Sequence, residues 1–82
     1  MKRAIALRYD PDEQQAPEIV SAGDGLLAEH IERAALQYGV PVVRDVPLAT
    51  ALSELAVGEQ IPEALYEAVA ALLNELAGGT GR

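Results

Sequence analysis

The segment covering residues 40–49 constrains the fold more than any other part of the chain. It begins with three β-branched valines grouped around Pro41, which favour an extended backbone. A charged pair closes this run, and Pro47 follows in a context that suits the first turn of a helix. The segment therefore predicts a strand at residues 40–44 that leads directly into a helix.

Two other segments are expected to be strands. In residues 3–9 the larger apolar side chains alternate with alanines, so both faces of this strand can be covered. A polar loop containing two prolines comes next. Residues 18–21 then form a second, shorter strand.

The helix after the second strand carries signals at both ends. Ser21 and Asp24 stand three apart, which approximates a capping box, and Gly39 is suited to end the helix in the left-handed conformation. The helical periodicity predicts a buried stripe made of Leu27, Ile31, Ala34, Ala35 and Tyr38.

These elements predict an α/β fold in a single domain that spans residues 1–82. We expect a small mixed β-sheet of about three strands with three helices packed around it. The expected strands are residues 3–9, 18–21 and 40–44, and the expected helices are about 24–38, 47–56 and 62–77. The strand–helix–strand order implies a right-handed parallel crossover to the third strand.

Charge and composition exclude several classes of function. The chain has 13 acidic and 6 basic residues and a net charge of −7, which is the wrong sign for binding phosphates of nucleic acid or an anionic membrane. It has no cysteine, so it has no disulfide framework and no thiolate metal site. No apolar run is long enough to span a membrane, and we expect a cytoplasmic location.

Candidate catalytic groups are sparse. His30 is the only histidine, and neither Ser21 nor Ser53 stands in a nucleophile-elbow sequence. The acidic loop around Asp10 lacks the alternating ligands and central glycine of a calcium loop. We therefore expect no enzyme activity, no cofactor and no metal site.

The chain also has apolar residues that are candidates for a binding surface. Ala16 and Pro17 end the loop before the second strand, and Ala70 and Leu73 lie three apart beside the main apolar stripe of the last helix. From the residues alone, the helical pair either widens the buried stripe or lines an exposed groove.

Motifs along nearly the whole chain resemble a known family. They are Ala6-Leu7-Arg8-Tyr9-Asp10, Ala16-Pro17-Glu18-Ile19-Val20 with Gly23, Val40-Pro41-Val42-Val43, Pro47-Leu48-Ala49, Gly58-Glu59-Gln60-Ile61-Pro62, and Leu65-Tyr66 with Ala68-Val69-Ala70. In this order and spacing they resemble the cytoplasmic domain of the export-apparatus switch proteins of flagellar and type III secretion systems, the FlhB/YscU family.

The resemblance implies a role in handling export substrates and in the switch from early to late substrates. It also implies a hydrophobic pocket for a short substrate motif, which falls here on Ala16, Pro17, Ala70 and Leu73. Family members cleave themselves at an Asn-Pro-Thr-His motif, but the only asparagine here, Asn74, precedes Glu75. Self-cleavage is therefore not expected.

The leading hypothesis is a free-standing, non-enzymatic protein-binding module, which binds export substrates or export-gate components in place of a cleaved switch-protein domain. It would be recruited to the export apparatus at the inner membrane. An unpaired strand edge near residues 3–9 would allow pairing with an N-terminal switch-protein fragment or a second copy of the chain. The alternative is a small acidic adaptor or regulator that has no role in export.

Overall fold

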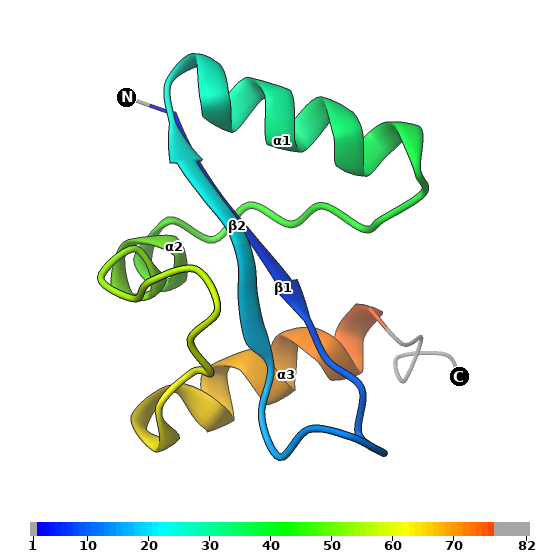
Figure 1. Ribbon diagram of the computed structural model, residues 1–82, viewed down its shortest axis with the longest axis vertical. Helices are drawn as coiled ribbons and strands as arrows, with labels where there is room; N and C mark the ends of the chain where they lie inside the picture. The colour runs from blue at the N-terminus through cyan, green and yellow to red at the C-terminus, as the bar shows by residue number, and fades with distance from the viewer. Residues whose placement is uncertain (1, 77–82) are drawn as a thin grey trace.

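The computed structural model describes residues 2–76 (Figure 1). Its elements are β1 (Arg3–Arg8), β2 (Glu18–Asp24), α1 (Leu26–Gln37), α2 (Val46–Leu52), the 3₁₀ helix η1 (Glu63–Leu65) and α3 (Tyr66–Leu76). The two strands run through the middle of the molecule, with α1 near one end and α3 near the other. The predicted α/β class with three α-helices is confirmed.

The sheet is an antiparallel pair with a bulge in β2. The pairing shifts by one residue between Ala6 and Leu7, which leaves Val20 without a partner. A bulge of this kind changes which side chains share a face. As a result Ile19 and Ala22, which are three residues apart, both pack toward the main core.

The core lies between the sheet and the second half of the chain. Its buried side chains are Ala16, Ile19, Leu48, Leu52, Ile61 and Val69. Helix α1 packs against both strands, and its Ala28 is fully buried outside that cluster. The sheet is therefore covered by helices on more than one side, as the alternation in the first strand predicts.

The two edges of the sheet differ. Residues 58–61 run along the outer edge of β2, where Gly58 N–H donates to Ile19 O at 2.7 Å and Ile19 N–H donates to Glu59 O at 2.9 Å. The outer edge of β1 has no such partner: among residues 2–76, no backbone hydrogen bond joins Arg3–Arg8 to a segment other than β2. Within the described residues, one edge of the sheet is thus hydrogen-bonded and the other is not.

The prediction of a third strand at residues 40–44 is wrong for this structure, and with it the parallel crossover and the mixed sheet. The segment has no strand assignment, and within residues 2–76 the backbone of residues 41–44 makes no backbone hydrogen bond. Figure 1 shows it running from the end of α1 toward α2. Valines favour an extended chain, but a strand also needs a neighbour at ladder distance.

The first helix ends as predicted but begins differently. Gly39 has φ 72°, and its N–H and that of Val40 bond back to Leu36 and Ala35, which is a Schellman motif. Ser21 and Asp24 are not a capping box. They belong to β2, which is longer than the expected 18–21 because its pairing with β1 continues to Asp24.

The buried stripe of α1 agrees with the prediction in its middle, where Ile31, Ala34 and Ala35 are half-buried, but not at its ends. Ala28 is completely buried, whereas Leu27 is 53% exposed and Tyr38 is 79% exposed. Periodicity identifies an apolar face, but the docking of the helix on the strands selects which part of that face is covered.

The two later helices begin close to the predicted positions. Helix α2 has Pro47 in its first turn and Asp45 as its N-cap, but it ends at Leu52 rather than near residue 56. Pro62 precedes the turn of 3₁₀ helix that leads into α3. The last expected helical position, residue 77, lies outside the described residues.

Candidate functional site

The four residues predicted to form a pocket lie around one hollow. Ala16 and Pro17 approach it from the β1–β2 loop, and Ala70 and Leu73 approach it from α3. The hollow has a volume of about 180 Å³ and no charged side chain in its lining. The structure therefore brings together residues that are more than fifty positions apart in the chain.

Hydrogen bonds hold the loop side of the hollow. The N–H groups of Glu13 and Gln14 both donate to Asp10 O, at 3.0 and 2.8 Å. The Gln14 side chain accepts from Asp10 N–H and donates to Glu18 Oε1, each at 2.8 Å. These bonds fold the loop back on itself and deliver Ala16 and Pro17 to the helix side at a defined position.

The four residues differ in how much ligand surface they can offer. Ala16 is 1% exposed and belongs to the core, and Pro17 is also buried. Leu73 is half-buried and packs against the core, while Ala70 is exposed. Ala16 and Pro17 thus form the floor of the hollow, and Ala70 and Leu73 form one wall. Leu73 therefore does both things that the sequence left open: it widens the buried stripe of α3 and lines a groove.

Two tyrosines also line the hollow, and neither was predicted from the sequence to do so. Tyr9 follows the end of β1 and Tyr66 begins α3, and each is 41% exposed. Their rarity could have identified them as candidate site residues, because tyrosines are the only aromatic residues in the chain and there are three of them. Both also lie within the motifs that carry the family resemblance.

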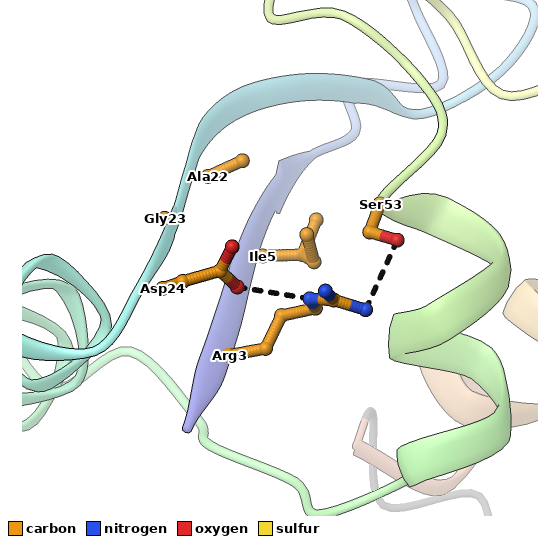
Figure 2. Close-up of a pocket in the computed structure, with 6 residues that line it drawn as sticks. All are labelled: Arg3, Ile5, Ala22, Gly23, Asp24 and Ser53. Carbon is orange, nitrogen blue, oxygen red and sulfur yellow. Dashed lines mark hydrogen bonds and ion pairs between the residues drawn. The ribbon is translucent and has the colours of Figure 1, made fainter. Parts of the chain in front are cut away.

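A second hollow, of about 230 Å³, lies between the strands and the end of α2 (Figure 2). The Arg3 guanidinium crosses it, donating to Asp24 Oδ1 at 2.9 Å and to Ser53 Oγ at 3.2 Å. Both partners belong to the protein, so Arg3 links the strand pair to α2. The Arg3 side chain therefore has a structural role.

Most ion pairs within residues 2–76 lie away from the apolar hollow. The Lys2 ammonium donates to Glu32 on α1 at 2.7 Å. This hydrogen bond, with the charges of Lys2 and Arg44, lowers the pKa of the Glu32 carboxyl below its usual value. Within residues 2–76, no three histidine or acidic side chains are grouped so that they could hold a metal ion.

None of the helices within residues 2–76 has the length and apolar character needed to cross a bilayer.

Comparisons with known proteins identify relatives along most of the chain. The chain is 39% identical to Bacillus subtilis YlqH over 74 residues, which is 90% of this chain and 80% of YlqH. It is 42% identical to the flagellar biosynthetic protein FlhB of Salmonella typhimurium over 71 residues, which is 85% of this chain but 18% of FlhB. The chain thus spans about a fifth of the length of the FlhB proteins that it matches.

Solved structures agree with the sequence comparison. The PscU C-terminal domain superposes with a TM-score of 0.88 at 34% identity, covering 93% of this chain and 98% of that domain. A mutated EscU/SpaS C-terminal domain has a TM-score of 0.85 at 35% identity and covers 89% and 91%. Residues 1–76 match the sequence model of the family described as FlhB, HrpN, YscU and SpaS, and the chain belongs to that family.

Proposed function

We propose that this domain is a non-enzymatic protein-binding module of flagellar or type III export, which holds a short segment of an export substrate or export-gate protein in the apolar hollow. It would serve in place of the cleaved C-terminal domain of a full-length switch protein. Its place of action would be the cytoplasm, at the export apparatus.

One observation carries the proposal. Ala16, Pro17, Ala70 and Leu73, the positions that match the family's substrate pocket, lie around a single hollow with an open apolar wall. Burial of an apolar side chain against such a wall is favourable, at about 25 cal/mol for each Å² removed from water. The candidate catalytic side chains, in contrast, lie apart: Ser21 on β2, His30 on α1 and Ser53 at the end of α2.

A pull-down from the native organism tests the proposal. Wild type is compared with Ala70→Asp and Leu73→Asp, which place a carboxylate in the hollow. Ala71→Asp is the matched control, because Ala71 is exposed on the same helix but does not line the hollow. The proposal is supported if wild type and Ala71→Asp recover export substrates or gate proteins and the two hollow variants do not.

The same recovery with all four proteins would refute it. Ala70→Asp is the more informative of the two variants, because Ala70 is exposed and its replacement is not expected to disturb the core. Far-UV circular dichroism on each variant checks that the domain is folded.

A second contact would use the unpaired edge of β1. Arg3–Arg8 has an unpaired outer edge among the described residues, and Val40, Val42 and Val43 are 51%, 42% and 44% exposed in an extended segment. Unpaired strand edges recruit strands from other chains. We propose that β1 pairs with a strand of another polypeptide, either an N-terminal switch-protein fragment or a second copy.

Size-exclusion chromatography and crosslinking test this contact over a range of concentrations, with and without a candidate N-terminal fragment. Ile5→Pro removes an N–H from the outer edge of β1, because the register directs the N–H groups of Ala4 and Ala6 toward β2, and it is expected to reduce pairing. Because the same change can weaken the intramolecular sheet, its fold is checked by circular dichroism. A monomer under every condition would exclude the contact.

The competing function is an acidic adaptor without a role in export, which the net charge of −7 favours. Its binding to a basic partner would weaken with salt and would be unchanged by Leu73→Asp. Binding that is lost in Leu73→Asp with the fold retained separates the two functions.

A further inference from the structure

The rim of the apolar hollow is built from two aromatic side chains on different elements. Tyr9 and Tyr66 are each 41% exposed, whereas Val69 beneath them is 1% exposed. Tyrosine offers an apolar ring at low cost in conformational entropy, and its polar tip can stay in water. The rim can therefore contact an inserted side chain from two directions.

The size and lining of the hollow limit what it can take. Its volume of about 180 Å³ is close to that of the cavity of ~150 Å³ that holds benzene in an engineered protein. One branched aliphatic or aromatic side chain fits this space. A charged side chain does not suit it, because no lining residue carries an opposite charge and an unpaired buried charge is costly.

Three acidic residues lie close in sequence to residues that line the hollow. Glu67 lies three residues before Ala70 on α3, so the two residues are neighbours on the helix surface. Glu63 begins η1, three residues before Tyr66. Asp10 follows Tyr9 on the loop side. These three carboxylates are exposed and make no salt bridge with a cation of residues 2–76.

The nearby cation does not offset them. Arg8 is next to Tyr9 in the sequence, but its guanidinium is paired with Glu18 at 3.3 Å. Three other cations are paired toward the other end of the strands: Lys2 and Arg44 with Glu32, and Arg3 with Asp24. The unpaired charges next to the lining residues are therefore negative, whereas the lining itself is uncharged.

We infer that the hollow binds a peptide in which one uncharged apolar side chain is flanked, within a few residues, by Lys or Arg. The apolar side chain sits between Tyr9 and Tyr66, and the cation lies against Glu63 and Glu67. This inference rests on the proposed function, because it takes the same hollow as the binding site and specifies the chemistry of its ligand. Charge complementarity at such a rim mainly sets specificity and association rate.

Selection from a displayed library of random 12-residue peptides tests the ligand chemistry without assuming a sequence. The bait is the full chain, and peptides that also bind Leu73→Asp or Ala70→Asp are discarded. We expect the remaining peptides to share one apolar position with Lys or Arg nearby. Enrichment of apolar peptides with acidic or neutral flanks would overturn the inference and leave the hollow as a binding site. No enrichment over the variants would overturn both.

Matched variants then measure the role of the rim charges on a selected peptide, by fluorescence anisotropy. Glu63→Gln combined with Glu67→Gln is expected to weaken binding about two- to tenfold at low salt, as for exposed ion pairs, and to have little effect in 0.5 M salt. Glu29→Gln combined with Glu54→Gln removes the same charge from α1 and the turn after α2 and should change binding less. Equal weakening by both pairs would show a general charge effect and overturn the inference.

Discussion

The backbone N–H of Ile61 donates a hydrogen bond of 2.9 Å to the carbonyl oxygen of Pro17. The bond joins the loop side of the apolar hollow to the segment that leads into α3, and both residues are buried. Because a buried backbone hydrogen bond is costly to break, the two sides of the hollow cannot separate without local unfolding. The hollow is thus part of the folded core and not a gap between mobile segments.

Shortening Ile61 tests this dependence on the core. Ile61 is 2% exposed and belongs to the main cluster, so Ile61→Ala should lower the free energy of unfolding by about 2–5 kcal/mol, against about 0.5–1.5 kcal/mol for Ile61→Val. Urea unfolding followed by circular dichroism measures both. Equal and small effects of the two changes would mean that the side chain is not packed as described.

The start of α2 depends on a single side-chain cap. Asp45 Oδ1 accepts a hydrogen bond of 3.1 Å from Leu48 N–H. Asp45→Ala should therefore lower the free energy of unfolding by about 1 kcal/mol, whereas Asp45→Asn keeps a cap and should cost much less. Chemical denaturation of the three proteins measures the difference. An Asn variant as unstable as the Ala variant would argue against the cap.

Gly23 is required where β2 passes under α1. A Cβ atom added there would clash with Leu27 Cγ and would lie 2.9 Å from Leu27 Cβ. Gly23→Ala should lower the free energy of unfolding by about 1–3 kcal/mol, as overpacking does. Adding Leu27→Ala removes the Cγ clash but keeps the Cβ contact, so we expect partial rescue, measured as a double-mutant cycle. Additive effects of the two changes would contradict the predicted clash.

The Lys2–Glu32 pair predicts a dependence of stability on acid pH. The hydrogen bond from Lys2 lowers the pKa of Glu32 from its ordinary value of 4.5. A carboxyl with a lowered pKa in the folded state stabilises the protein above pH 4.5, and the contribution is lost as the pH falls through the lowered pKa. Glu32→Gln should thus unfold at lower urea concentration than wild type at pH 7, with a gap that closes in acid.

The matched control for this pair is Glu29→Gln, which removes a carboxylate from the same helix that makes no salt bridge within residues 2–76. Its difference from wild type should change less across the same pH range. A gap between wild type and Glu32→Gln that stays constant down to the most acid pH would refute the assignment.

Local signals in the sequence predicted the helix boundaries best. Gly39 ends α1 with a positive φ and two backbone bonds to the preceding turn, and Pro47 lies in the first turn of α2. Each of these signals acts through residues within five positions of one another. The capping box at Ser21 and Asp24 failed because a longer-range interaction, the pairing of β2 with β1, extends the strand through both residues.

The candidate site was predicted in a different way. Ala16, Pro17, Ala70 and Leu73 were assigned through the family resemblance, and the structure brings them around one hollow. Periodicity alone left Ala70 and Leu73 ambiguous between core and groove. Tyr66 was missed as a lining residue, because its position at the rim depends on how α3 crosses the β1–β2 loop.

The α/β class, the two segments that form strands and the membership of a family of export proteins all follow from the order of the residues. Packing in the folded chain sets the other features: which face of α1 is buried, the bulge at Val20, and the failure of residues 40–44 to join the sheet. The physical reason lies in the range of the interactions. Valines around Pro41 favour an extended backbone through local sterics, but a strand forms only where a second backbone lies at hydrogen-bonding distance, and the neighbouring residues do not encode that partner.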